Sequence, residues 1–269
     1  MRIRPQLLAV LAIAVTALAV QAPAAFATTP APGYEQFAGC PSHAENPTIE
    51  VCTHATINGG YFQMGNKNVP IKKQMTLSGG FNGELGGFAA NSKGGLTPVK
   101  QLVPGGVIGL TGLDWLINFL SIEALQLYAV TEAVGPPSLG ETLNLPIRVH
   151  LINPVLGNNC YVGSPSTPIQ LHLTEHTTSP PPPNTPISGV PFEFKGDENG
   201  ILTLNNGVVV DNSFAAPGAS GCVLTLFGFI PISINGLVNS ASGLPAPAGT
   251  NATSQNMNMQ LVSASLVYP

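Results

Sequence analysis

The fold class of this 269-residue chain is decided by one stretch, LPIRVHLI, which runs from Leu145 to Ile152. Its apolar residues Ile147, Val149 and Leu151 alternate with polar or charged ones. Because successive side chains of a strand point to opposite faces, this alternation predicts a β-strand with one buried and one solvent-facing side. Such a strand is typical of an antiparallel sheet that covers a core with one face only.

The same design recurs outward from this stretch. Residues 169–174 repeat the alternation, and residues 124–130 also have a period of two. Five Gly-Gly pairs fall between residues 59 and 106, and glycine at that density marks turns and argues against helix. We therefore predict an all-β fold, mainly antiparallel, that is a β-sandwich or jelly-roll-like domain with one or two short helices.

Further elements follow from spacing and turn residues. A short helix is expected at 113–120, where apolar residues have helical spacing, and an ambiguous short helix at 230–239. Gly59-Gly60 predicts a hairpin turn, and the stretch SPPPPNTP at 179–186 predicts a polyproline crossing outside any sheet. The remaining expected elements are Asn- and Gly-containing turns at 197–200 and 205–207, and strands at 48–56, 61–64, 69–78, 192–195, 200–204, 208–211, 223–229 and 257–267.

The N-terminal residues have the pattern of an export signal. Arg2 and Arg4 precede an uncharged apolar run, and an A-x-A site follows at residues 25–27. The run is shorter than the roughly 20 residues that a membrane-spanning helix needs, although an uncleaved anchor is the alternative. We predict a cleavable signal peptide at 1–27, an extended leader at 28–47 and a single β-rich domain at 48–269, with no transmembrane segment after cleavage.

The chain carries few charges. Charged residues make up 8% of it, against roughly 25% in ordinary soluble proteins, and its formal net charge is −4. A chain with so few Lys and Arg has no basic footprint for nucleic acid and little attraction to anionic lipid. A surface of Asn, Ser, Thr and Gln suits hydrogen-bonded contact with sugars or proteins outside the cell. It equally suits a source organism with that compositional bias.

Four cysteines remain after the expected cleavage: Cys40, Cys52, Cys160 and Cys222. An even number in an exported chain implies disulfides, and three connectivities are possible. We favour Cys40–Cys52, which closes a short local loop, and Cys160–Cys222, which ties two β regions together. A zinc site is the competing interpretation, but no C-x-x-C spacing supports it.

Two cysteine-containing segments resemble exported proteins of unassigned function from high-GC Gram-positive bacteria. They are LPIRVHLINPVLGNNCYVG at 145–163 and VVDNSFAAPGASGC at 209–222. The resemblance implies export and a Cys160–Cys222 disulfide. It implies no catalytic residues, because none is assigned in such proteins.

The sharpest chemical pattern is H-x-x-E-H, formed by His172, Glu175 and His176. In inverted zinc peptidases both histidines bind metal and the glutamate is the base, which requires a helix. Here the preceding residues alternate as a strand and prolines follow, so we expect a solvent-facing strand end. An adventitious two-histidine metal site and a peptidase are the alternatives.

Other candidate groups have weaker support. Ser220 lacks the G-x-S-x-G context of a hydrolase nucleophile. Glu193 and Glu198 could form the carboxylate pair of a glycosidase, but nothing in the sequence marks either residue as buried. Asn251-Ala252-Thr253 is a glycosylation sequon.

A calcium site is a further possibility, built from Asp197, Asn199 and Asp211, but turn formation explains the same residues and the EF-hand spacing is absent. Glycine-rich phosphate loops are also absent. We therefore predict no catalytic, metal or cofactor site.

The leading functional hypothesis is a secreted or cell-envelope-associated, non-catalytic binding or structural protein. Its partner would be cell-wall polymer or another envelope protein. One alternative is an extracellular carbohydrate-active or other hydrolase whose residues meet only in the folded chain. Another is a carrier of an apolar ligand, suggested by the excess of apolar residues at 107–127.

Overall fold

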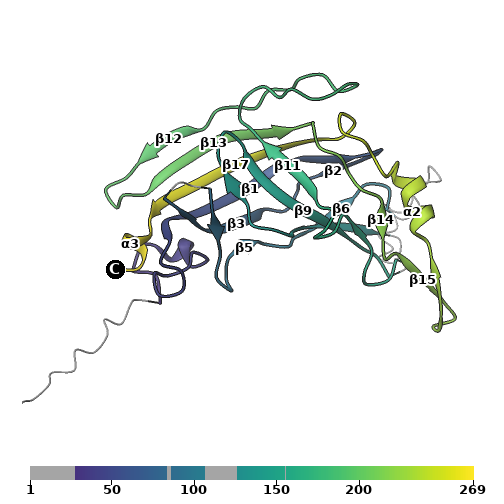
Figure 1. Cartoon of the computed structure of the whole chain (residues 1–269), viewed down its shortest axis with the longest axis horizontal. Helices are drawn as coiled ribbons and strands as arrows, with labels where there is room; N and C mark the ends of the chain where they lie inside the picture. Colours follow the sequence, from purple (N-terminus) through teal and green to yellow (C-terminus); the bar gives the residue numbers. More distant parts are fainter. Residues whose placement is uncertain (1–27, 84–85, 107–125, 155) are drawn as a thin grey trace, which may run out of the picture.

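The structure is a computed structural model that describes residues 28–83, 86–106, 126–154 and 156–269 (Figure 1). Within these residues the strands form two large antiparallel sheets, which we name sheet A and sheet B, and one separate hairpin. Sheet A has the order β12-β13-β17-β1-β3-β4, with β2 beside β1 and β5 beside β3. Its strands are β1 (Ile49–Met64), β2 (Lys67–Pro70), β3 (Met75–Asn82), β4 (Phe88–Ala89), β5 (Gly95–Leu96), β12 (Glu193–Gly196), β13 (Leu202–Asp211) and β17 (Ala252–Ser263).

Sheet B has the order β14-β10-β9-β7-β6, with β8 and β11 also paired to β9. Its strands are β6 (Lys100–Val103), β7 (Leu127–Ala133), β8 (Ser138–Leu139), β9 (Leu143–Ile152), β10 (Tyr161–Val162), β11 (Ile169–Leu173) and β14 (Ala219–Ser220). The separate hairpin consists of β15 (Val223–Leu226) and β16 (Ile230–Ser233). In the described residues the helices are the 3-10 turn η1 (Glu35–Phe37), α2 (Asn235–Ser242) and α3 (Ala264–Val267). The predicted all-β, mainly antiparallel sandwich with short helices is confirmed.

The main core draws side chains from both sheets. Ile57 and Met257 come from sheet A, and Ile147 and Leu171 come from sheet B. In β9 every second residue is buried from Leu143 to Leu151, as the opening stretch predicts. In β11 buried and exposed residues alternate in the same way. One-sided burial therefore explains the period of two in both strands.

A second, smaller core lies where the two ends of the described chain meet. Phe37, Cys40, Val262, Val267 and Tyr268 are buried in it. The Tyr268 hydroxyl donates a hydrogen bond of 2.8 Å to the carbonyl of Cys40. Burial raises the pKa of this tyrosine, and the charge of nearby Glu45 adds to the shift. The segment expected as an extended leader thus folds into turns that pack against the last residues of the chain.

Both favoured disulfides are present, Cys40–Cys52 and Cys160–Cys222. The first links the N-terminal segment to β1. The second links the residue before β10 to the residue before β15, so that it ties the base of the separate hairpin to sheet B.

The predicted hairpin turn at Gly59-Gly60 is wrong. β1 runs through this pair without reversing, and its register with β17 shifts between Ile57 and Gly59, which is a β-bulge. Gly60 has a φ of +110°, and a Cβ on it would lie 2.0 Å from the Ser254 carbonyl oxygen. The glycine is therefore required for a close approach between strands rather than for a chain reversal.

The predicted turn at 205–207 is also wrong, because β13 is continuous and carries a bulge there. Asn206 takes a left-handed φ of 57°, which Asn tolerates better than most residues. Its backbone N–H donates to the side-chain oxygen of Asn258 on β17. The expected meander reduces to one hairpin of β12 and β13, whose turn at 197–200 is as predicted.

Three other boundaries differ from the sequence prediction. The strand expected at 69–78 splits into β2 and β3, because the Lys72 and Lys73 amides bind the side chain of Gln101 instead of a strand. Residues 230–239 contain β16 and the start of α2. The last strand begins at Ala252 and ends at Ser263, where α3 follows and carries Val267 into the second core. The helix expected at 113–120 and most of the apolar stretch 107–127 lie outside the described residues.

The proline-rich segment 179–186 crosses from β11 of sheet B to β12 of sheet A without joining either, as predicted. The side-chain amide of Asn184 donates to the carbonyls of Asn212 and Asn251 and fixes the crossing. Among the described residues, no helix is long and apolar enough to cross a membrane.

Candidate apolar groove

An open groove lies where the two sheets separate, and we call it the mouth groove. It has a volume of about 310 Å³. Sheet A contributes side chains of β12, β13 and β17, and sheet B contributes β8, the turn after it and the end of β11. Four residues that define it are Leu204, Met257, Met259 and Leu261.

Aromatic side chains complete the apolar lining. Phe192 and Phe194 both face the groove, and Phe194 is 67% exposed. Met257 and Met259 are buried members of the main core and form the floor of the groove, so Phe194 is the large apolar side chain that the groove exposes to solvent. A wider hollow of about 880 Å³ adjoins the groove at Leu261 and continues the apolar surface past Leu202.

The position of Phe192 is fixed by two contacts. Its ring lies on Gly207, where an added Cβ would be 2.2 Å from the ring. Its backbone N–H donates a 3.0 Å hydrogen bond to the Glu175 carboxylate. The β13 bulge and the bend after β11 therefore position this wall of the groove together.

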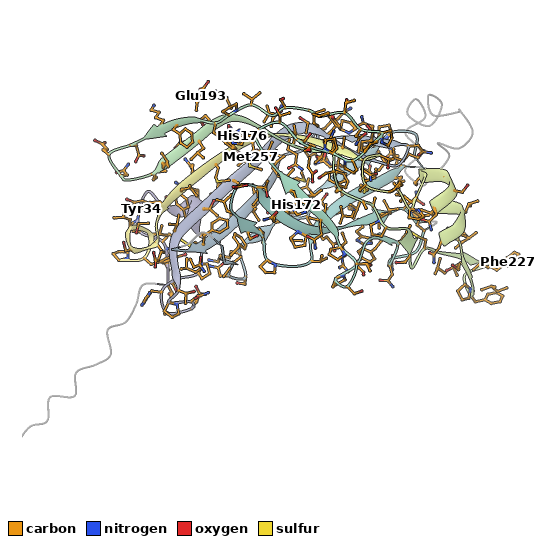
Figure 2. The ribbon with its side chains drawn as sticks, turned by 45° about the horizontal axis from the view of Figure 1, so that its top comes forward. Tyr34, His172, His176, Glu193, Phe227 and Met257 are labelled. Carbon is orange, nitrogen blue, oxygen red and sulfur yellow. A yellow bond between two sulfur atoms is a disulfide. The ribbon has the colours of Figure 1, made fainter. Side chains whose placement is uncertain are left out.

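The two histidines of the H-x-x-E-H pattern line one hollow of about 260 Å³ together with Glu141 and Asp211, but Glu175 is not among the residues that line it. His172 is on β11 and its Nδ1 lies 2.6 Å from the side-chain oxygen of Asn144, whereas His176 is in the bend beyond the strand (Figure 2). Glu175 is engaged with Phe192, and it lies with Glu141 and His176 among the residues that line the mouth groove. No group of three or more His, Cys, Asp or Glu side chains in the described part of the chain could hold a metal ion.

The aspartates of the possible calcium site, Asp197 and Asp211, accept hydrogen bonds within the folded chain. The Asp197 carboxylate accepts from the N–H groups of Asn199 and Ile201, which closes the β12–β13 turn. Asp211 is buried, and its carboxylate accepts from the N–H of His172 and from Ser213. These contacts account for both aspartates without a bound cation.

The other candidate residues from the sequence analysis lie in places where their contacts serve the fold. Ser220 lies on the short strand β14 beside Cys222. Glu193 accepts a hydrogen bond from the side chain of Asn206 on an exposed edge, and Glu198 is in the adjoining turn. Asn251 of the sequon is completely buried, and its side chain binds the Phe214 carbonyl and the Gly65 N–H. The folded chain therefore has no room for a glycan there.

The interior between the sheets offers little space. A cavity lined by residues such as Ile57, Met75, Leu145 and Leu171 has a volume of about 40 Å³. Ligand pockets usually measure roughly 300–1,000 Å³, so this cavity is too small for an organic ligand. The mouth groove of about 310 Å³ and the adjoining hollow of about 880 Å³ do reach that size.

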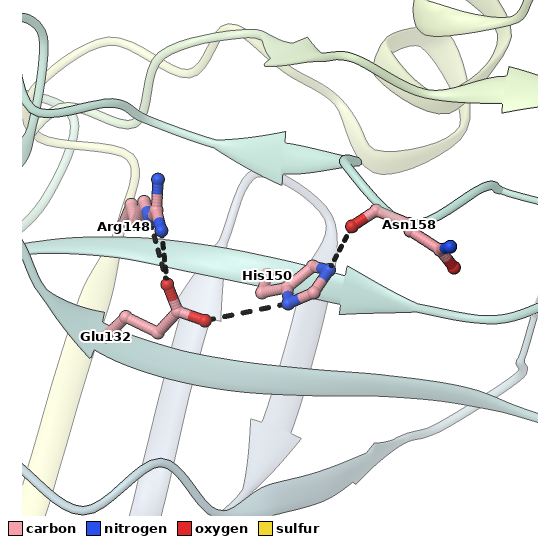
Figure 3. A network of polar contacts seen from close by, with 4 residues as sticks. All are labelled: Glu132, Arg148, His150 and Asn158. Carbon is pink, nitrogen blue, oxygen red and sulfur yellow. Dashed lines mark hydrogen bonds and ion pairs between the residues drawn. The ribbon is translucent and has the colours of Figure 1, made fainter.

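Two polar clusters escaped the sequence analysis. Arg148 makes an ion pair of 2.8 Å with Glu132, and His150 lies between Glu132 and the carbonyl of Asn158 (Figure 3). The Tyr161 ring lies 4.1 Å from the guanidinium of Arg148 and is also stacked on His150. These charged and aromatic side chains contact one another across β7, β9 and β10. Their contacts stabilise the solvent-facing side of sheet B.

The second cluster is a His54–Ser78 pair on the outer face of sheet A, with 2.7 Å between Nδ1 and Oγ. Burial lowers the pKa of His54, so the imidazole is held neutral. Beside it, β1 and β17 present a row of uncharged side chains that we call the amide face: Thr56, Asn58, Asn256, Asn258 and Gln260.

Comparison with known proteins gives no match to this chain among family models, curated proteins or solved structures.

Proposed function

We propose that this is an extracellular, non-catalytic binding protein that takes an apolar group in the mouth groove. The observation that carries the proposal is the exposed Phe194 above a floor of Leu204, Met259 and Leu261 in a groove of about 310 Å³. An apolar hollow with a few polar groups on its rim is the usual form of a ligand site. Glu141, Glu175 and His176 supply that rim and suit the polar end of an amphipathic molecule such as a fatty acid ester or a lipid.

An extracellular location is supported by the two disulfides, since such bonds persist in oxidising compartments. The export pattern at residues 1–27 and the resemblance of the two cysteine-containing segments to exported proteins point the same way. The low charge content also suits a protein that works by apolar and hydrogen-bonded contact.

The test is binding of a fluorescent long-chain acyl probe to the purified, oxidised protein. Phe194→Ser removes an exposed ring from the groove and should weaken binding about tenfold, the effect of removing roughly 1.4 kcal/mol of apolar contact. Leu266→Ser on α3 is the matched control, because Leu266 is exposed but does not line the groove. Equal binding by the wild type and Phe194→Ser, or no binding by either, would reject the groove as the site.

The amide face favours a second candidate function, binding of a neutral cell-wall polymer. Asn58 and Asn256 are exposed, and the register places Thr56 opposite Asn258 on the neighbouring strand. Uncharged amides and hydroxyls can donate to and accept from sugar hydroxyls. Co-sedimentation with wall polymer should then be lost in Asn256→Leu with Asn58→Leu, without release of soluble fragments. Release of fragments by the wild type would instead support the hydrolase alternative.

A further inference from the structure

The hairpin of β15 and β16, which we call the apolar finger (residues 223–233), projects from the body of the molecule. It pairs with neither sheet among the described residues. It extends at the end of the molecule opposite to α3 (Figure 1), and Phe227 lies at its outermost point (Figure 2). Its side chains at the tip therefore have no cover from the rest of the described chain.

Large apolar side chains are concentrated on this finger. Phe227 and Phe229 are 86% and 74% exposed, and Ile230 and Ile232 are exposed as well. Single exposed apolar residues are ordinary on a protein surface, but several together mark a site of contact with a protein or a membrane.

The identity of Phe227 is not explained by folding. Phe227 has a φ of 51° and Gly228 one of 79°, so both residues have left-handed backbones in the turn. Turns of this kind favour Asn, Asp or Gly, because a side chain with a branched or bulky Cβ substituent is strained there. The chain places a phenylalanine in this position and leaves it exposed, where it gains nothing from burial.

The base of the finger is held by covalent and hydrogen bonds, and the finger carries no charged residue. The Cys160–Cys222 disulfide ties its base to sheet B, and the Cys222 N–H donates to the side chain of Asn235 at the start of α2. No Asp, Glu, Lys, Arg or His occurs from Asn212 to Pro269. Transfer of the tip out of water therefore requires no charged group to lose its hydration.

We propose that the apolar finger inserts its tip into the surface layer of a lipid membrane and attaches the protein there. A convex apolar tip needs a medium that closes around it on all sides, and the acyl region of a bilayer is such a medium. A second copy of this chain fits less well. Its mouth groove and the adjoining hollow are open on one side, so they would cover only part of a convex tip.

The proposal predicts how attachment depends on lipid charge. Because residues 212–269 contain no Lys or Arg, the finger itself contributes no attraction to anionic headgroups. Binding should therefore be equal for neutral and anionic vesicles and should not change with salt. Attachment to the membrane depends on the finger alone and does not require the mouth groove to bind a ligand.

The experiment is co-sedimentation of the purified, oxidised protein with phosphatidylcholine vesicles and with vesicles that also contain an anionic phospholipid. Phe227→Asn and Phe229→Ser should each lower the partition coefficient about tenfold or more, the effect of removing one buried aromatic side chain. Phe227→Asn should melt at the same or a higher temperature than the wild type, because Asn suits the turn. Leu266→Ser at the opposite end is the control and should bind as the wild type does.

Three results would overturn the proposal. The wild type could stay in the supernatant with both kinds of vesicle. Phe227→Asn and Phe229→Ser could bind as tightly as the wild type. Alternatively, sedimentation without lipid could show that the wild type self-associates and that the finger variants are monomers, which would make the finger an interface between copies. Because acyl-probe binding by the mouth groove is measured without vesicles, failure of either proposal is recognised separately.

Discussion

The Nδ1 atom of His54 lies 2.7 Å from the hydroxyl oxygen of Ser78, across the neighbouring strands β1 and β3. Burial lowers the pKa of this imidazole below its usual value of 6.5. The unfolded chain therefore takes up the proton before the folded chain does as the pH falls. The stabilisation from neutral His54 is complete above about pH 6.5 and is lost as the pH falls through the lowered pKa of the folded state.

The measurement is urea unfolding at a series of pH values for the wild type and His54→Gln. Gln retains a hydrogen-bonding group for Ser78 but does not titrate. We expect the wild type to lose stability relative to His54→Gln as the pH falls below about 6.5. If the stability difference between the two proteins does not change with pH, the linkage is absent.

The two disulfides should differ in their contribution to stability. Cys160–Cys222 closes a loop with a sequence separation of 62, and Cys40–Cys52 one of 12. In the loop-entropy model these correspond to about 4 and about 3 kcal/mol. We expect the paired substitution Cys160→Ala with Cys222→Ala to be the more destabilising in urea unfolding. A larger loss from the Cys40 and Cys52 pair would show that the second core depends on its disulfide beyond this entropy.

The sequence predicted most of the architecture where burial is one-sided. Residues 145–152 and 169–174 alternate because one face of β9 and β11 packs on the core, and that pattern is local. The disulfides were predictable because the alternatives were few. The bulges were not, because glycine and asparagine supply positive φ to turns and bulges alike. Whether Gly59-Gly60 forms a turn or a bulge is decided by pairing with β17, which lies far from β1 in the sequence.

The candidate sites were less accessible to sequence analysis for the same reason. The mouth groove combines residues from β8, β12 and β17, whose proximity depends on strand order. The apolar finger carried a local signal, the uncharged run FGFIPI at residues 227–232. Its pattern predicts the end of one strand and the start of a helix, because exposure cannot be deduced from composition.

The bulge in β1 can be tested with its two adjacent glycines. A Cβ at Gly60 would lie 2.0 Å from the carbonyl oxygen of Ser254, at a φ of +110°. A Cβ at Gly59 would only approach the side-chain amide of Asn256, at 3.3 Å. We expect Gly60→Ala to lower the free energy of unfolding by roughly 1–3 kcal/mol and Gly59→Ala by clearly less. Similar losses from both substitutions would contradict the close approach at Gly60.

The last prediction separates a binding role of the mouth groove from a catalytic one. The Glu175 carboxylate accepts the Phe192 N–H at 3.0 Å, and this contact holds the aromatic wall. Glu175→Gln keeps a side-chain oxygen that can accept this hydrogen bond, so acyl-probe binding and stability should stay close to those of the wild type. Glu175→Ala leaves the N–H without this partner, and it should cost about 1–2 kcal/mol of stability and weaken probe binding. Glu198→Ala, at an exposed carboxylate outside the groove, is the matched control and should change neither property. A catalytic carboxylate would behave differently, because neither Gln nor Ala can transfer a proton, and both variants would then lose a hydrolytic activity equally. Recovery of function by Gln but not by Ala would therefore identify Glu175 as a positioning residue for Phe192.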